Sequence, residues 1–255
     1  MEDLELAQLL ADAADEISLA RFRSQDLRIE KKPDRTPVTD ADQRVEERIR
    51  ELIAEHRPGD SVIGEEFGAG EAAAREWIID PIDGTANFLR GLPIWATLIA
   101  LRVNGELVAS VVSAPALGRR WWAQTGKGAW TRDVDSAIRR CRVSGVATIE
   151  DSYFSYNSIG QWQQFGREDR IAQLAKKVWR IRAFGDFLSY MYVAEGLIEA
   201  ASEPDLKLYD IAALVPIVRE AGGRFTGLDG ELDDSTSAVL ATNSLLHDQY
   251  LKELS

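Results

Sequence analysis

The sequence contains one cysteine, Cys141, among 255 residues, so no disulfide can form within the chain. This scarcity is typical of proteins in a reducing compartment. The first seventeen residues are acidic and amphipathic, without the basic start or small-residue cleavage site of a secretion signal. No apolar run approaches the length of a membrane span. We therefore expect a soluble, cytoplasmic protein with no membrane partner.

Basic residues are also scarce. Thirty Lys and Arg stand against 42 Asp and Glu, which gives a formal net charge of −12. A nucleic-acid backbone is bound mainly through clustered cations, so a nucleic-acid partner is not expected. If a chain this acidic binds phosphate, bound cations have to offset the repulsion between its carboxylates and the phosphate. We interpret the densest basic pairs as solvated strand ends; they are Lys31-Lys32, Arg119-Arg120 and Arg139-Arg140.

The first half predicts two helices and an antiparallel meander. Residues 3–22 and 40–56 carry apolar side chains at helical spacing. Asn104-Gly105 is a strong hairpin signal between two apolar runs. The expected strands of the meander are residues 94–103, 106–114, 120–124 and 129–132. Residues 27–30 and 61–64 are expected as short strands, and the prolines in 32–37 predict a loop between the helices.

The second half predicts alternating helices and strands, which favours a layered α/β arrangement. We expect one compact unit in two parts, with a boundary near residues 133–136. Residues 1–134 would hold the helix pair, the meander and the main metal site, and residues 135–255 the α/β half. The expected helices are 167–178, 186–195, 209–221 and 244–254, and the expected strands are 179–182, 197–201, 224–226 and 238–242.

The most informative segment is residues 77–85, in which an apolar run leads into Asp80 and Asp83. We expect Pro81 to hold this pair in a tight turn. Two carboxylates so close repel each other unless a cation or a proton lies between them. Mg²⁺ takes such oxygen ligands, and the carbonyl of Ile82 can supply another.

A glycine and a threonine follow this acidic pair directly. The backbone N–H groups of Gly84 and Thr85 would stand at the start of a short helix, where anions bind readily. Adjacent metal and phosphate sites favour metal-assisted phosphate hydrolysis. Three further acids follow loops or strand ends: Asp42, Glu65 and Asp210. Taken singly these three are weak signals, and for Asp42 and Asp210 alone we favour the interpretation as helix N-terminal acids.

Together these segments resemble the signatures of the inositol-monophosphatase family. The resemblance spans nearly the whole chain, and within the family it is strongest to histidinol-phosphatases of the actinobacterial type, through residues 32–42, 114–122 and 182–190. It implies an α/β (α+β) fold, a layered αβαβα sandwich of the sugar-phosphatase type. It also implies a homodimer. The matching segments are Gly64-Glu65-Glu66, residues 77–85, Tyr209-Asp210 and residues 220–223.

The resemblance implies a set of metal ligands. Glu65, Asp80 and the Ile82 carbonyl would hold one Mg²⁺, and Asp80, Asp83 and Asp210 a second. Glu65 would also support a weaker third ion through waters. The family pattern of ligands is complete in this sequence.

The resemblance also implies catalytic and phosphate-binding roles. Asp42 and Thr85 would orient the nucleophilic water, with Glu65 assisting through the metal. The amides of Gly84 and Thr85 would bind the phosphate. No serine, cysteine or histidine nucleophile is required, and we expect both histidines, His56 and His247, at the surface.

Residues of the second half are expected to bind the alcohol part of the phosphate ester and so to determine which substrate is used. Asp186 follows Gly185 at a position where inositol enzymes of the family carry a small or hydroxylated residue, and Glu203 matches a position that contacts the alcohol. Both carboxylates would suit the ammonium and imidazole of histidinol phosphate. The helix dipole alone explains Asp186 equally well. Two interpretations of Arg182 are equally good. Its side chain contacts either the site or a partner subunit, or it is an ordinary surface residue of a strand.

These inferences lead to ranked hypotheses. The first is a Mg²⁺-dependent phosphoric monoester hydrolase that cleaves L-histidinol phosphate in histidine biosynthesis, by attack of a metal-activated water. The alternative within the same chemistry is inositol-1-phosphate hydrolysis. Bisphosphate substrates are disfavoured, because a second phosphate would need more basic residues. A hypothesis of a different class is a catalytically silent binding or regulatory protein.

Overall fold

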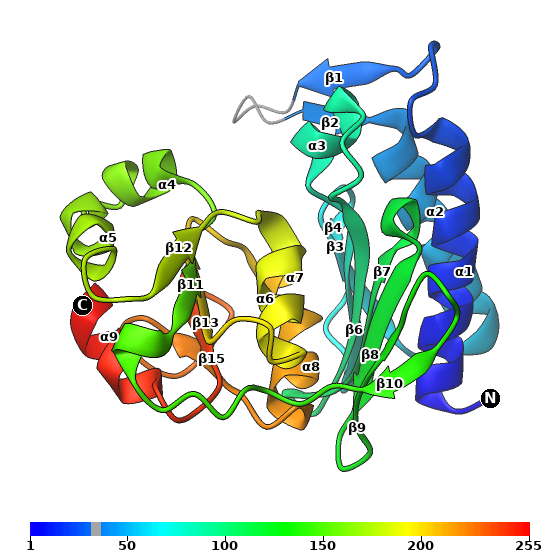
Figure 1. Ribbon diagram of the computed structural model, residues 1–255. Coiled ribbons are helices and arrows are strands. Elements are labelled where there is room, and N and C mark those ends of the chain that lie inside the picture. The colour runs from blue at the N-terminus through cyan, green and yellow to red at the C-terminus, as the bar shows by residue number, and fades with distance from the viewer. Residues whose placement is uncertain (32–36) are drawn as a thin grey trace.

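The computed structural model describes residues 1–31 and 37–255, in which helices and two large β-sheets alternate in five layers (Figure 1). Helices α1 (Asp3–Arg21) and α2 (Asp40–His56) cover the outer face of the first sheet. Helices of the second half lie between the sheets and beyond the second one. The expected αβαβα sandwich is therefore confirmed. The predicted loop over residues 32–37 falls almost entirely outside the described residues.

The first sheet has eight strands in the order β10-β9-β8-β7-β6-β5-β3-β4. All neighbours are antiparallel except β3 and β5, which run parallel. The predicted hairpin is confirmed: Asn104 and Gly105 both have positive φ, as the tight turn requires. The meander continues at both ends beyond the predicted strands. In chain order the strands are β3 (Ser61–Gly64), β4 (Gly68–Ala69), β5 (Arg75–Asp83), β6 (Ala96–Val103), β7 (Glu106–Ala114), β8 (Arg119–Gln124), β9 (Gly128–Arg132) and β10 (Ile138–Arg140).

The second sheet has five strands in the order β12-β11-β13-β15-β14. Strand β11 runs parallel to both β12 and β13, whereas β15 is antiparallel to its neighbours. A separate two-stranded sheet pairs β1 (Ile29–Lys31) with β2 (Pro37–Thr39). The strands of the five-stranded sheet are β11 (Tyr153–Ser155), β12 (Arg180–Arg182), β13 (Ala200–Pro204), β14 (Arg224–Gly227) and β15 (Ala238–Thr242).

The helices of the second half depart from the prediction in two places, the first of which is α4 (Ile159–Gln164), a helix that was not predicted. The single helix expected over residues 209–221 is two helices that meet at Ala213. Pro216 has no N–H to donate to the carbonyl four residues earlier, which ends α7 before α8 begins. The short helix after Asp83 is confirmed as α3. The helices are α3 (Thr85–Arg90), α4 (Ile159–Gln164), α5 (Glu168–Leu174), α6 (Asp186–Ala194), α7 (Leu208–Ala212), α8 (Leu214–Glu220) and α9 (His247–Leu254).

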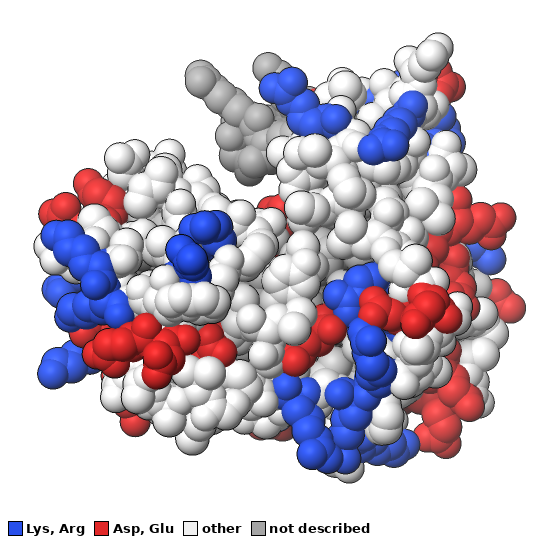
Figure 2. All heavy atoms as spheres, viewed as in Figure 1, with Lys and Arg blue, Asp and Glu red and all other residues white. Residues whose placement is uncertain are grey.

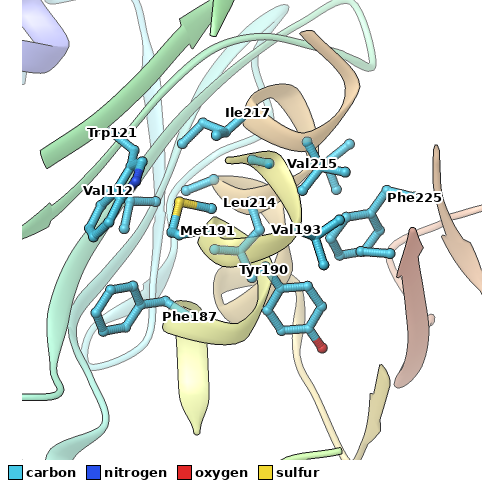
Figure 3. Close-up of a cluster of buried hydrophobic side chains, with 14 of the residues drawn as sticks. Val112, Trp121, Phe187, Tyr190, Met191, Val193, Leu214, Val215, Ile217 and Phe225 are labelled. Carbon is cyan, nitrogen blue, oxygen red and sulfur yellow. The ribbon is translucent and has the colours of Figure 1, made fainter. Parts of the chain in front are cut away.

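The largest hydrophobic cluster joins the two sheets through α6 and α8 (Figure 3). Trp121 on β8 faces Phe187 and Met191 of α6, while Phe225 on β14 stacks on Tyr190 from the other side. Burial of each such side chain stabilises the fold by roughly 1.5–3 kcal/mol. The two halves of the chain therefore share one core, which fixes the elements on either side of the region between them.

Arg120 contradicts its interpretation as part of a solvated strand end. Its side chain is only 3% exposed and lies between the first sheet and α1. The guanidinium is 2.6 Å from Asp15 and 2.7 Å from Asp12, and it also donates to Ser113. The prediction was wrong because the partners come from a helix about a hundred residues earlier. A paired, hydrogen-bonded charge can remain buried where a free one cannot.

His247 also contradicts its predicted surface position, because its ring is fully buried at the start of α9. Nε2 lies 2.9 Å from the hydroxyl of Thr226 and Nδ1 lies 3.0 Å from that of Thr242. The Thr226 hydroxyl donates to the Gly227 carbonyl, and the Thr242 oxygen accepts from the Ser244 amide. This network suits a neutral ring protonated on Nε2. Burial lowers the pKa of His247 to about 4.

His247 should make the stability of the protein depend on pH. The unfolded ring titrates near 6.5 and the folded ring near 4. Between these values only the unfolded state binds the proton, so the free energy of unfolding should fall by up to about 3 kcal/mol as pH drops from 6.5 to 4. We expect His247→Gln to be less stable than wild type at pH 7, with a gap that narrows towards pH 4. Urea denaturation across this range tests this, with His56→Gln as control; a constant gap would contradict it.

Candidate active site

A β-bulge brings Asp80 and Asp83 together. Along a regular strand, residues three positions apart point to opposite faces of the sheet. Here Asp80 pairs with Leu98 but Asp83 pairs with Ala96, so β5 carries one extra residue against β6. This extra residue returns both aspartates to the same side. The expected tight turn is thus a bulge within β5. Pro81, which lacks an N–H, is well placed in it.

Asp210 completes an acidic cluster with this pair. One carboxylate oxygen from each of Asp80, Asp83 and Asp210 lies within 4.8 Å of the others. Asp80 is 2% exposed, and the other two are half-buried. Asp210 comes from the first turn of α7, where it accepts a 2.6 Å hydrogen bond from the Lys207 amide. The second half of the chain therefore contributes one carboxylate to a cluster whose other two members lie on β5.

The electrostatics of this cluster fit a bound cation. Burial and then the neighbouring charge of Glu65 raise the pKa of Asp80 well above its ordinary value. Burial and then Asp186 and Asp210 raise the pKa of Asp83 in the same way. Burial raises the pKa of Asp210 to about 7. A divalent cation would relieve this repulsion, and clustered carboxylate oxygens are the donors that hard cations prefer.

Glu65 reaches the cluster from the neighbouring strand. It follows β3 directly, and its amide donates to the Ile79 carbonyl of β5 at 3.2 Å. β3 and β5 are parallel, with Gly64 opposite Ile79, so Glu65 lies beside Asp80. The side chains of Glu65 and Asp80 are within hydrogen-bonding reach. The structure thus brings all four acids of the predicted ligand set together.

Asp42 and Thr85 form a second feature of the site. Asp42 is fully buried in the first turn of α2, and its Oδ2 accepts from the Thr39 amide at 2.8 Å in a capping box. The Thr85 hydroxyl lies 3.4 Å from Asp42 Oδ1 and 3.0 Å from the carbonyl of Ile82. Burial raises the pKa of Asp42 to about 6.

Gly84 and Asp83 connect the site to α6. Gly84 has φ +84° and precedes α3, and a side chain there would lie 3.0 Å from the Ile94 carbonyl and 3.3 Å from Asp186. Asp83 Oδ2 accepts a 2.8 Å hydrogen bond from the amide of Phe187. The start of α6 is therefore held against the end of β5, and only glycine fits at position 84.

The predicted alcohol-binding residues gather at one edge of the second sheet. Asp186 follows β12, and Glu203 lies near the end of β13, which runs in the same direction. Ligands of open α/β sheets bind at such carboxyl ends. In Figure 2 the surface between the two sheet-bearing parts is hollowed, and acidic atoms are visible in the hollow.

Burial raises the pKa of both predicted alcohol-binding acids. The pKa of Asp186 rises to about 6, opposed by its hydrogen bond with Asn87. Burial and the charges of Asp186 and Asp210 raise the pKa of Glu203 well above its ordinary value. A cationic ligand between Asp186 and Glu203 would favour their charged forms.

Two asparagines of this region were missed by sequence reasoning. Asn87 donates to Asp186 Oδ2 at 2.7 Å and to the Ile94 carbonyl at 2.9 Å. Asn157 follows β11 with φ +52° and hydrogen-bonds Glu203. Asn87 stands two residues after the recognised segment 77–85, so its polar side chain was a usable signal. Asn157 gave none, because the three-residue strand before it was not predicted.

Arg182 and Gly185 are the remaining predicted site residues. Arg182 ends β12 with an exposed side chain that donates to the carbonyl of Ile181 at 2.7 Å. Its contact with a substrate or a partner subunit stays a prediction. Gly185 has φ +88° and precedes α6, where Asp186 also has a positive φ of +49°. This uncommon backbone aims the start of α6 at the site.

Comparisons with known proteins agree with this geometry. The inositol monophosphatase family profile matches residues 2–255. The chain is 50% identical over 254 residues to a histidinol-phosphatase of Mycobacterium tuberculosis, with 99% of this chain and 98% of that protein covered. It is also 50% identical over 255 residues to a histidinol-phosphatase of Streptomyces coelicolor, covering 98% and 96%. The structure of a Thermotoga maritima IMPase matches with a TM-score of 0.89 at 32% identity, covering 100% of this chain and 97% of that one.

The fold and the acidic cluster define a phosphoric monoester hydrolase of a metal-dependent class. The chain belongs to the inositol monophosphatase family. No helix within the described residues is both long and apolar enough to cross a membrane.

Removing one carboxylate charge should stabilise the metal-free protein. Asp83→Asn keeps an oxygen that can accept from the Phe187 amide but ends the repulsion with Asp186 and Asp210. In the presence of a chelator we expect Tm at pH 8 to rise by roughly 2–4 °C, or about 1 kcal/mol. Added Mg²⁺ should then raise Tm for wild type but far less for the variant. Thermal denaturation measures both effects; a destabilised variant that Mg²⁺ still stabilises fully would contradict the assignment.

Proposed function

We propose that the protein hydrolyses L-histidinol phosphate to L-histidinol and phosphate, as a step of histidine biosynthesis, with Mg²⁺ as its metal. The 50% identity to two proteins named histidinol-phosphatase over nearly the whole chain supports this substrate. The observation that carries the proposal is the position of two carboxylates, the half-buried Asp186 and the buried Glu203, beside the metal-binding cluster. They offer a cationic alcohol the charge partners that a neutral one does not need.

We assign two or three Mg²⁺ ions to the acidic cluster. Glu65, Asp80 and the Ile82 carbonyl would hold one ion, and Asp80, Asp83 and Asp210 a second, with Glu65 supporting a third through waters. The Ile82 carbonyl lies 3.0 Å from the Thr85 hydroxyl, and a carbonyl oxygen has two lone pairs, so it can also serve as a ligand. When bound, Mg²⁺ neutralises phosphate charge and makes water a better nucleophile.

Asp42 and Thr85 are proposed to orient the attacking water. The capping box holds Asp42, and the Thr85 hydroxyl lies within reach of both Asp42 Oδ1 and the Ile82 carbonyl, to either of which it can donate its single proton. A group that receives a proton must lie within hydrogen-bond reach of it. Asp42 Oδ1, with a pKa near 6, can take a proton through Thr85 Oγ1 near neutral pH. Glu65 is placed to act on the same water from the metal side.

The phosphate and the alcohol are proposed to bind next to each other at the end of β5. The amides of Gly84 and Thr85 follow Asp83 and would bind phosphate oxygens. Asp186 is tied to the same segment through Asn87, and its carboxylate points towards Gly84. A substrate that carries a phosphate and a cationic group could thus contact both at this end of β5.

Inositol-1-phosphate hydrolysis is the second candidate, favoured by the close fold match to the Thermotoga maritima IMPase. It shares the metal chemistry and differs only in the alcohol. A catalytically silent binding protein is disfavoured, because silent relatives would be expected to have lost ligands and this chain retains Glu65, Asp80, Asp83 and Asp210.

The two substrates are separated by a parallel assay of phosphate release. Purified protein with Mg²⁺ should hydrolyse L-histidinol phosphate far faster than inositol 1-phosphate, and neither without Mg²⁺. Asp186→Asn, which tolerates the positive φ and can still accept from Asn87, should lower kcat/KM for histidinol phosphate roughly 10–100-fold, the value of a charged hydrogen bond. Inositol 1-phosphate hydrolysis by the variant is the control. Equal losses on both substrates would refute the role of Asp186, and no release of phosphate from histidinol phosphate would refute the function.

We also propose a homodimer, an inference that begins with the family resemblance. A suitable surface lies at the edge of the second sheet, where β12 is the outermost strand. Trp179, 61% exposed, leads a row of aromatic rings that continues through Tyr153, Phe184 and Tyr192 with centroids 5.1–6.1 Å apart. Arg180 lies over the Trp179 ring at 5.3 Å. Exposed aromatic surface of this kind is enriched at interfaces.

Trp179→Glu should weaken the proposed dimer, because it places a charge at the centre of this surface. We expect the mass measured by light scattering after size-exclusion chromatography to fall from that of two chains towards that of one. Leu92→Glu, at another exposed apolar residue, is the matched control. A wild-type protein that elutes with the mass of a single chain would refute the dimer.

A further inference from the structure

The carboxylate of Glu46, on α2, packs against the end of β3, the strand that Glu65 directly follows. Glu46 is fully buried on the face of α2 towards β3. A Cβ atom at Gly64 would lie only 2.0 Å from Glu46 Oε1, and the three atoms nearest to it all belong to Glu46. The glycine therefore makes room for the carboxylate, which passes against the backbone.

This carboxylate binds the backbone just beyond Glu65. Glu46 Oε2 accepts from the amide of Glu66 at 2.8 Å, and Oε1 accepts from the amide of Phe67 at 3.3 Å. On the other side, the amide of Glu65 itself is bound to the Ile79 carbonyl of β5. The backbone that carries Glu65 is thus held both before and after its side chain.

Arg50, one turn further along α2, adds to these contacts. We call Glu46 and Arg50 together the clamp. Arg50 Nε donates to Glu46 Oε1 at 2.8 Å, and its Nη2 donates to the carbonyl of Gly68 at 2.6 Å. The guanidinium lies 5.9 Å from the ring centroid of Phe67. Burying a carboxylate is costly unless it is paired and hydrogen-bonded. Here Glu46 is paired with Arg50, and both side chains hydrogen-bond the backbone of the turn over residues 64–68.

We propose that Glu46, with Arg50, is a positioning residue that sets the carboxylate of Glu65 against Asp80 and thereby controls metal affinity. The proposal rests on the ligand role proposed above for Glu65. Glu46 acts only through the backbone of the turn and does not touch the metal. Partners that orient metal ligands in this way typically change metal affinity 10–100-fold when they are lost.

The test is calorimetric titration of Mg²⁺ into the chelator-stripped, full-length protein. Glu46→Gln keeps the shape but sets an NH₂ group against amide donors, and we expect its Kd for Mg²⁺ to rise roughly tenfold. Arg50→Gln should give a smaller rise, because the Glu66 contact survives. Gly64→Ala should reproduce the loss, because its Cβ displaces the carboxylate. Glu47→Gln, the same change on the exposed side of α2, is the matched control and should bind as wild type does.

The binding constants separate this role from a merely structural one. A folded Glu46→Gln protein with a lower Tm but wild-type Mg²⁺ affinity overturns the proposal. If that variant does not fold, Arg50→Gln decides, and an unchanged Kd there overturns it. If the wild-type protein binds no Mg²⁺, both the positioning role of Glu46 and the metal assignment are refuted. Wild type that binds Mg²⁺ but leaves histidinol phosphate intact overturns only the substrate, and the variants' Kd values still decide the clamp.

Discussion

The structure depends on holding several carboxylates together against their mutual repulsion. Asp80, Asp83 and Asp210 lie within 4.8 Å of one another, in surroundings that disfavour ionised carboxylates. The backbone restrains each of them: a bulge orients Asp80 and Asp83, the Phe187 amide holds Asp83, and the Lys207 amide holds Asp210. Part of the free energy gained elsewhere in the fold is thus spent on an arrangement that a bound cation would relieve, and such binding would stabilise the folded state.

The layered core makes that arrangement possible. The proposed ligands come from β5, α7 and the turn after β3, elements on both sides of the cluster that contains Trp121, Phe187 and Tyr190. Because α6 and α8 pack on both sheets, a loss of packing there would move Asp210 relative to Asp80. The same helix α6 begins with Asp186, which is bound through Asn87 to the segment that carries Asp83. In the proposed function, metal geometry and alcohol recognition would therefore depend on one set of contacts.

Much of the fold and of the acidic cluster could be predicted because the signals were local. The hairpin at Asn104-Gly105 and the helices α1 and α2 follow from short-range patterns, and the metal ligands from the family resemblance. Burial of polar residues could not be predicted in this way. Arg120 and His247 were misplaced because acids on α1 and two threonine hydroxyls on β14 and β15 satisfy them, and only the tertiary fold brings those groups close. The three-residue strand β11 was too short for any periodicity, so Asn157 was missed with it.

The contrast between Glu65 and Glu46 shows where sequence reasoning ends. Glu65 is recognisable because its chemistry is used directly and its neighbours form a pattern. Glu46 is one acid among several on an amphipathic helix, and its neighbour Glu47 is exposed. What distinguishes Glu46 is the absence of a side chain at Gly64, eighteen positions later, and two amides that no sequence pattern assigns to it. A glycine next to a metal ligand usually suggests a turn or a close substrate. Here it provides space for a second carboxylate, so the precision of the site depends on a helix that contributes no atom to the metal.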